Sequence, residues 1–203
     1  MKFDKLVNIL INEIFNTKKR LGWMFYAGKL TGLFKASNNI EYKVEFEQVE
    51  GNSFEDYPKG VPYSILKEIA KKNKNKELDK EIEKLYFSWS NNSYNNIPVF
   101  NLTFSPLKGS MPSQDYEDWG INNTGSSSEI FGIIINGLIS LFKGNIKDSK
   151  YIKMFFFFAK EPSRISLYHK IAKILSAKIP FKYSSARVKD KIEGDQFYWV
   201  FYK

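Results

Sequence analysis

Residues 151–159 read YIKMFFFFA, and this stretch decides the class of fold. Four consecutive phenylalanines, Phe155–Phe158, leave no polar position on either side of an extended chain. Because side chains alternate between the two faces of a strand, a continuous apolar run predicts a central strand covered on both faces. Such a strand needs elements packed on both sides of its sheet.

The segments around this strand predict the rest of the sheet. Residues 130–142 form a predicted helix that is apolar nearly all round and therefore buried, and residues 163–178 form one with a single apolar side. Residues 97–105, 181–188 and 196–202 read as strands. We therefore expect an α/β (α+β) fold, a mixed central sheet flanked by helices, with helix 130–142 joining two parallel strands.

The first half of the chain predicts smaller elements. Apolar residues at helical spacing predict an amphipathic helix over residues 3–15. A strand at 23–34, broken by Gly28 and Gly32, and another at 40–49 form a predicted hairpin around Asn38-Asn39. Residues 63–72 read as a helix, and residues 71–84 as a solvated helix face, because their charges alternate in sign.

Length and composition predict one domain, residues 1–203. It comprises an N-terminal helix, hairpin and charged helices over 1–105, and a strand/helix half over 121–203. With 203 residues, 43% of them hydrophobic, the chain can bury a core.

The chain has no cysteine, which excludes disulfides and thiolate metal sites and fits a reducing compartment. The longest apolar run, 130–142, is short of the roughly 20 residues that cross a bilayer. No secretory signal is apparent, so we expect a soluble, cytoplasmic protein without membrane contacts.

The positive charge is concentrated in one region. The formal net charge is +9. Between Lys143 and Lys191 there are thirteen Lys or Arg residues and three acidic ones, an excess of ten. One interpretation is a solvated basic surface. The other is a face that binds phosphates of a nucleic acid or of a phosphorylated cofactor; a protein partner is a further alternative.

Several kinds of chemistry are excluded by residue counts. His169 is the only histidine, so two-histidine metal sites cannot form and a catalytic triad has one candidate base. We expect His169 to be a solvated helix residue. Three acidic residues, Asp115, Glu117 and Asp118, cluster in a long loop, but solvated acids explain them better than a ligand set, so we predict no metal site.

The segment Asn122-Asn123-Thr124-Gly125-Ser126-Ser127-Ser128-Glu129 opens the buried helix. Free N–H groups and the helix dipole make such a position suitable for phosphate. Ser126 and Glu129 also have the spacing of a capping box, which would satisfy the helix start without a ligand. Both interpretations stay open, because a capped helix can still bind an anion.

The succession of strand, glycine-containing turn, helix, buried strand and a helix bearing Leu167-Tyr168 resembles the second half of the GNAT-superfamily acyltransferases. The resemblance covers about 80 residues from Ile121 onward. It implies a turn that cradles the pyrophosphate of acetyl-CoA or another acyl-CoA, and a tyrosine that protonates the departing thiolate. By this resemblance Tyr168 would be the general acid. The resemblance would also place Gly125 and Ser127 in the pyrophosphate turn. We predict that the cofactor-binding residues are Asn122, Thr124, Gly125, Ser126, Ser127 and Arg164.

The chain departs from that family at several positions. The usual turn has Arg or Gln where Asn122 stands, and Gly or Ala where Ser127 stands. The Asn and Ala that precede the Leu-Tyr pair are Glu161 and Arg164 here. The resemblance therefore implies either an N-acyltransferase or a relative that has lost catalysis.

The combination of Thr124-Gly125 and Ile130-Phe131 with the segment Phe158–Arg164 and with Leu167-Tyr168 is similar to uncharacterised proteins of tailed bacteriophages. This similarity implies a phage origin, with location in the host cytoplasm or in the virion, and assigns no activity. The alternative function is therefore a non-enzymatic virion or host-interaction protein that uses its basic C-terminal half.

Arg164 stands at the start of the helix over residues 163–178, where the dipole disfavours a cation. A bound anion or an ion pair with Glu161 would resolve this conflict. We expect Ser163 to be the N-cap of this helix, because it follows a strand and Pro162.

Overall fold

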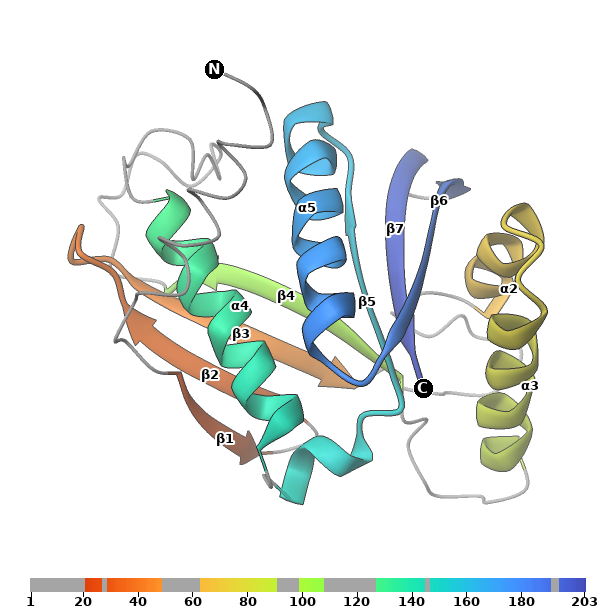
Figure 1. Ribbon diagram of the computed structural model, residues 1–203, viewed down its shortest axis with the longest axis horizontal. Helices are drawn as coiled ribbons and strands as arrows, with labels where there is room; N and C mark the ends of the chain where they lie inside the picture. Colours follow the sequence, from red (N-terminus) through yellow and green to blue (C-terminus); the bar gives the residue numbers. More distant parts are fainter. Residues whose placement is uncertain are drawn as a thin grey trace. The chain divides into compact units, whose positions relative to one another are not determined.

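The computed structural model describes residues 21–26, 29–48, 63–90, 99–107, 127–144, 147–190 and 194–203. Seven strands form one sheet in the order β1-β2-β3-β4-β5-β7-β6 (Figure 1). The strands are β1 (Gly22–Tyr26), β2 (Lys29–Lys35), β3 (Glu41–Gln48), β4 (Val99–Pro106), β5 (Met154–Ala159), β6 (Lys182–Asp190) and β7 (Gly194–Tyr202). The helices are α2 (Tyr63–Lys72), α3 (Lys76–Ser90), α4 (Ser127–Lys143) and α5 (Pro162–Lys178), with a 3-10 helix, η2 (Lys147–Tyr151). The α/β class with a mixed sheet flanked by helices is confirmed.

Clustering of the chain gives two compact units. The first comprises residues 1–45 and 104–144, and the second comprises residues 46–103 and 145–203. Each unit is described by itself. The helix predicted over residues 3–15 lies outside the described residues, and the single domain stays a prediction.

The first unit begins with a hairpin where the sequence predicted one strand. Residues 23–34 were expected to form one strand broken by Gly28 and Gly32, but β1 and β2 pair antiparallel from Gly22↔Leu33 to Tyr26↔Lys29. Only two residues connect Tyr26 to Lys29, which is the length of a tight hairpin loop. The chain therefore reverses inside the predicted strand. The next turn follows the prediction, since Asn39 adopts a left-handed conformation with φ 64° between β2 and β3.

Helix α4 belongs to the first unit and is largely buried, as its apolar sequence predicted. The indole Nε1 of Trp23 donates to the carbonyl oxygen of Gly137 at 3.3 Å. The ring of Phe131 packs edge-on against Phe104, with centroids 5.5 Å apart. A Cβ added to Gly137 would collide with the side chain of Leu21. The close approach of Leu21, just before β1, to α4 therefore depends on a residue without a side chain.

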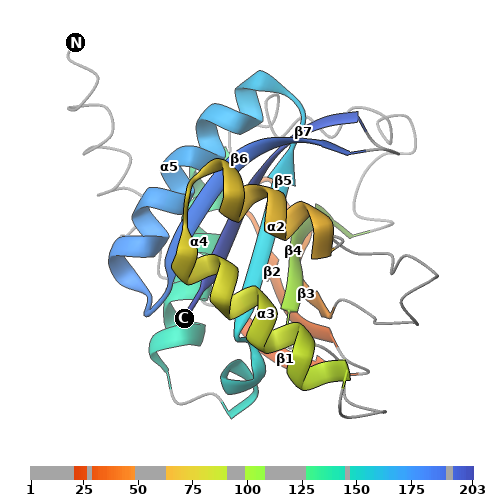
Figure 2. The same ribbon diagram turned by 90° about the vertical axis from the view of Figure 1, so that its right-hand side faces the viewer.

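The second unit is built on both faces of β5. Helices α2 and α3 cover one face, and α5 lies on the other (Figures 1 and 2). Buried residues of α2, of α3 and of the sheet form one apolar cluster. It includes Leu66, Ile69, Leu78, Ile82, Val99, Met154, Phe156, Tyr198 and Val200. On the opposite face, Phe155 stacks on Phe201 with centroids 4.7 Å apart. The four phenylalanines are thus divided between two apolar layers, although Phe158 keeps 39% of its surface exposed.

Strand β7 lies between β5 and β6 and pairs antiparallel with both. The connection from β6 ends at Gly194, which has φ 80°, a conformation that glycine adopts without strain. This placement gives β7 two hydrogen-bonded neighbours, and Trp199, Val200 and Phe201 are fully buried.

Helix α5 begins one residue earlier than predicted. Its N-cap is Glu161 and Pro162 occupies the first turn, so Ser163 is inside the helix and is not the cap. Proline favours the first helical position because its fixed φ suits the helix and its missing N–H would have no partner there. No side-chain hydrogen bond caps this end of α5.

Candidate functional site

The parallel strands β4 and β5 pair only at their beginnings. Their register contains three pairs, Val99↔Met154, Phe100↔Phe155 and Asn101↔Phe156. Both strands continue further, β4 to Pro106 and β5 to Ala159. The ladder therefore stops within the second unit, where Leu102 and Phe157 are not paired with each other. Unpaired backbone at a strand junction is where an extended, amide-bearing ligand can hydrogen-bond.

Asn101 stands at the last paired position. Side chains alternate along a strand, so Asn101 shares a face with Val99, which belongs to the cluster under α2 and α3. Its Oδ1 atom is buried, and no hydrogen-bond donor reaches it within the described part of the chain. An amide oxygen left without a donor costs about 1–3 kcal/mol. Sequence reasoning missed this residue, because a single Asn in an apolar strand gives no signal of where its ladder ends.

Tyr168 lies beside the first residue of β5 past the pairing. Its ring packs edge-on against Phe157, with centroids 5.4 Å apart and an interplanar angle of 90°. It makes a second edge contact with Trp199 at 5.6 Å. Only 7% of Tyr168 is exposed. The ring is therefore part of the apolar layer between α5 and the sheet.

The hydroxyl of Tyr168 is held in its protonated form. Burial raises its pKa to about 12, while the positive charge of Arg164 opposes this rise and the negative charge of Glu161 adds to it. These two charged residues flank the start of α5, and both act on the hydroxyl. A phenol in this state keeps its proton at neutral pH and can donate a hydrogen bond or a proton, but it cannot serve as a base.

Arg164 forms the ion pair that the sequence analysis considered. Its Nε lies 3.6 Å from Oε2 of Glu161, one turn earlier. Both side chains are substantially exposed, at 40% and 54%. An exposed pair of this kind contributes at most about 1 kcal/mol. The negative charge of Glu161 thus offsets the unfavourable interaction between the Arg164 cation and the helix dipole. An anion-contact role for Arg164 stays a prediction.

His169 is exposed on α5, in keeping with the expectation of a solvated histidine. It has in addition a structural role, because the indole Nε1 of Trp199 donates to its Nδ1 at 3.2 Å. Trp199 is fully buried. The acceptor Nδ1 must be unprotonated, so the neutral ring carries its proton on Nε2. Use of this nitrogen as a catalytic base would break the bond to Trp199.

The predicted pyrophosphate turn lies mostly outside the described residues, which include none of Asn122, Thr124, Gly125 and Ser126. Ser127 is the first residue of α4, and its side chain is not described. Further along, the carboxylate Oε2 of Glu129 accepts a bond from the backbone N–H of Ser37 at 3.1 Å and another from its hydroxyl. Because Ser126 lies outside the described residues, the capping-box interpretation stays a prediction. The bonds of Glu129 to Ser37 connect the start of α4 to the β2–β3 turn.

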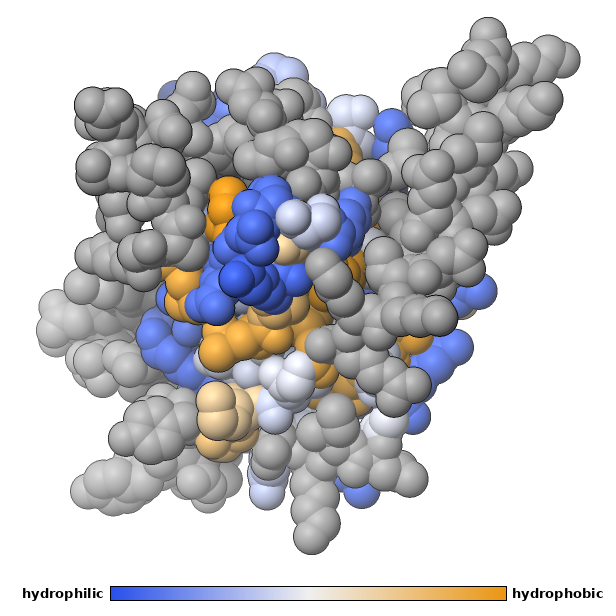
Figure 3. Space-filling model, turned by 90° about the vertical axis from the view of Figure 1, so that its left-hand side faces the viewer, coloured by the Kyte–Doolittle hydropathy of each residue, from blue (hydrophilic) through white to orange (hydrophobic). Residues whose placement is uncertain are grey.

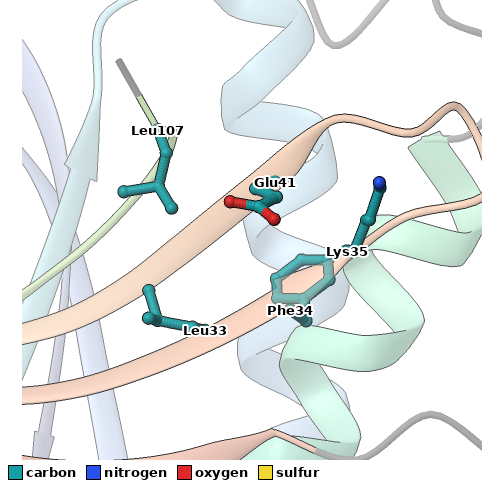
Figure 4. A pocket seen from close by; sticks show the side chains of 5 residues that line it. All are labelled: Leu33, Phe34, Lys35, Glu41 and Leu107. Atoms are coloured by element: carbon teal, nitrogen blue, oxygen red, sulfur yellow. The ribbon is translucent and has the colours of Figure 1, made fainter. Parts of the chain in front are cut away.

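A shallow hollow lies on the first unit, and none of the predicted site residues lines it. It is lined by Leu33, Phe34, Lys35, Glu41 and Leu107 and has a volume of about 210 Å³ (Figure 4). The backbone N–H of Leu107 donates to the carbonyl of Glu41 at 2.8 Å and closes one side. The lining has an apolar base with one cation and one carboxylate, but no nucleophile paired with a base, so this hollow offers no catalytic set.

Two further searches of the described ranges gave no candidate. No group of three or more His, Asp or Glu side chains is placed to hold a metal ion; Asp115, Glu117 and Asp118 lie outside these ranges. No helix there is both long and apolar enough to span a bilayer.

Comparison with protein-family models, with curated proteins and with solved structures gave no match.

Proposed function

We propose that this chain is a GNAT-like, acyl-CoA-dependent N-acyltransferase. The observation that supports this proposal best is the early end of the β4–β5 ladder beside Tyr168. Two parallel strands stop pairing after Asn101 and Phe156, and the next residue of β5, Phe157, contacts the tyrosine that the resemblance assigns as the acid. The proposal includes the pyrophosphate role of residues 122–127 and a phage origin, with location in the host cytoplasm or the virion.

The reaction would be a direct transfer. The lone pair of an amine forms a bond to the thioester carbon, and the carbon–sulfur bond breaks. The sulfur takes the proton of the Tyr168 hydroxyl, and the tyrosine regains a proton from the ammonium product through solvent. Backbone amides that β4 and β5 do not use to pair with each other, past Asn101 and Phe156, would position the thioester and stabilise the charge on its oxygen. Burial keeps Tyr168 protonated until the thiolate forms, although a pKa of about 12 makes it a weak acid.

Binding of acetyl-CoA tests the first half of the proposal. At 100 times its Kd, a ligand stabilises the folded chain by about 2.7 kcal/mol, which raises the melting temperature of a protein this size by several degrees. Gly125→Trp would fill the predicted pyrophosphate turn and should abolish the shift, while Gly22→Ala, in β1, should keep it. No shift with wild-type protein at millimolar acetyl-CoA would remove the acyl-CoA proposal.

Tyr168→Phe separates an active enzyme from an inactive relative. The substitution removes only the hydroxyl, so the acetyl-CoA shift should persist. Release of CoA in the presence of small primary amines, measured with a thiol reagent, should fall at least tenfold if the hydroxyl protonates the thiolate. Equal release by both proteins would contradict the acid role. If the wild type shows the acetyl-CoA melting shift but releases no CoA when amines are added, the chain binds acyl-CoA without this activity.

A second candidate is nucleic-acid binding, which the surface of α5 favours. This helix contains Arg164, Lys170, Lys173 and Lys178 and no acidic residue, and the three lysines are exposed. If these cations contact phosphates, the affinity for a 20-base-pair DNA should fall steeply between 50 and 200 mM salt. A flat response would exclude this candidate and leave a protein partner as the alternative for the basic half.

A further inference from the structure

The exposed surfaces of the two units differ in the chemistry that they offer to a partner. Figure 3 shows apolar residues beside charged ones on one face of the molecule. On the first unit, Met24, Phe25 and Leu33 have exposed apolar side chains, which fit many kinds of partner equally well. The second unit instead exposes a group of cations around one aromatic ring, and this combination selects a class of partner.

Phe197 is the centre of this group. It lies on β7, and its side chain is partly exposed. The ring of His169, on α5, meets it edge-on with centroids 4.7 Å apart. Within the sheet, Phe197 is paired with Arg187 of β6, and side chains directly opposite each other on antiparallel strands have Cβ atoms about 4.5–5.5 Å apart. The ring therefore has an imidazole on one flank and a guanidinium-bearing side chain on the other.

Two lysines extend the group along α5 and β6, which contact each other. Lys173 follows His169 by one helical turn and lies on the same flank of α5. Lys189 follows Arg187 by two positions and shares its face of β6. All four of these side chains are exposed. Together with the ring at their centre they form the α5–β6 strip, which consists of His169, Lys173, Arg187, Lys189 and Phe197.

The strip has an excess of positive charge. The ion pairs between described residues involve other lysines and Arg164, and none involves Lys173, Arg187 or Lys189. Helix α5 contains no acidic residue, and on β7 a single one, Asp195, lies opposite Lys189. Cations that no carboxylate neutralises attract phosphates. An aromatic ring among them can stack on an unpaired base.

We propose that the α5–β6 strip binds single-stranded nucleic acid, with a base stacked on Phe197 and the neighbouring phosphates bound by the cations of the strip. A duplex fits less well, because its bases are stacked inside the double helix and do not reach an aromatic side chain. The inference rests on the second candidate function, nucleic-acid binding, and is independent of the acyltransferase proposal.

Binding of a fluorescently labelled 20-nucleotide oligo-dT, measured by anisotropy in 50 mM salt, tests the strip. Phe197→Leu removes the stacking surface and should weaken binding at least fivefold. Arg187→Gln should also weaken binding, and should reduce the slope of log affinity against log salt by about 0.7, the value for one phosphate of a single strand. Lys80→Gln, at an exposed position on α3, removes the same charge outside the strip and should leave the slope unchanged.

The outcomes separate this inference from the functions proposed above. No binding of oligo-dT by the wild type would contradict both the strip and the nucleic-acid candidate. Equal salt slopes for Arg187→Gln and Lys80→Gln, or wild-type affinity in Phe197→Leu, would contradict the strip alone. Tighter binding of a 20-base-pair duplex or of polyglutamate than of oligo-dT would also contradict it. Arg187→Gln should keep the acetyl-CoA melting shift, so the acyltransferase proposal is tested separately.

Discussion

The indole of Trp199 illustrates how one exposed residue can control a buried one. Its N–H is inside the apolar layer, and its hydrogen bond goes to His169 on α5. His169→Phe keeps an aromatic ring next to Phe197 but removes the acceptor. A buried N–H without an acceptor costs about 1–3 kcal/mol, so we expect a loss of that size in the free energy of unfolding, measured with urea at pH 7.

The matched substitution is His169→Gln, whose side-chain oxygen can accept the same bond. It should recover at least part of the stability lost in His169→Phe. Equal stability of His169→Phe and wild type would mean that the indole does not depend on this bond. The sequence could predict that His169 is on a helix surface, but it could not predict this contact, since the two residues are 30 positions apart and meet only through packing of α5 on β7.

Among the elements, α4 packs tightly against Leu21, the residue just before β1. Gly137 lies in the helix, and a Cβ there would collide with Leu21, whose own Cβ and Cγ lie 3.0 and 3.1 Å away from it. In an exposed helix, Gly→Ala would add roughly 1 kcal/mol of stability. Here overpacking costs about 1–3 kcal/mol. We therefore predict that Gly137→Ala lowers the melting temperature, as measured by circular dichroism.

Two companion variants make this prediction specific. Gly22→Ala has no atom within 4 Å of the added Cβ and should change the melting temperature little. Adding Leu21→Ala to Gly137→Ala should recover some of the loss, because it removes the Cδ1 and Cγ atoms of Leu21, two of the three atoms that crowd the added Cβ. A melting temperature for Gly137→Ala at or above that of wild type would show that Leu21 moves aside without cost.

Local pattern was sufficient for most elements and insufficient for their pairing. Helix 63–72 and the helices and strands after residue 97 agree with the prediction to within a few residues. The strand expected at 23–34 was wrong, because a two-residue reversal between apolar segments leaves their alternation almost unchanged. The position of β7 between β5 and β6, and the early end of the β4–β5 ladder, depend on contacts between distant segments. For this reason Tyr168 and Arg164 could be nominated from sequence, while Asn101 could not.

At the scale of the whole molecule, buried tyrosines make the folded state sensitive to alkali. Burial raises the pKa of Tyr168 to about 12, and burial together with Tyr63 raises that of Tyr86 to about 12. Both values exceed the ordinary value of 10.0. Between pH 10 and 12 the unfolded chain therefore loses protons that the folded chain keeps. Their contribution to stability is complete below pH 10 and is lost as the pH rises through 12, by roughly 2 kcal/mol for each tyrosine.

Tyr86→Phe isolates one of these contributions. The Tyr86 hydroxyl is buried and has no hydrogen-bond partner among the described residues, so removing it should leave stability at pH 7 equal or slightly higher. Urea unfolding at pH 9.5 and 11.5 should then show a smaller alkaline loss for Tyr86→Phe than for wild type. Tyr151→Phe, at a position 66% exposed, is the control and should lose as much as wild type. If Tyr86→Phe loses as much stability at high pH as the control, the Tyr86 phenol ionises in the folded chain without a penalty. The hydroxyl would then be in contact with solvent, contrary to its burial in the structure.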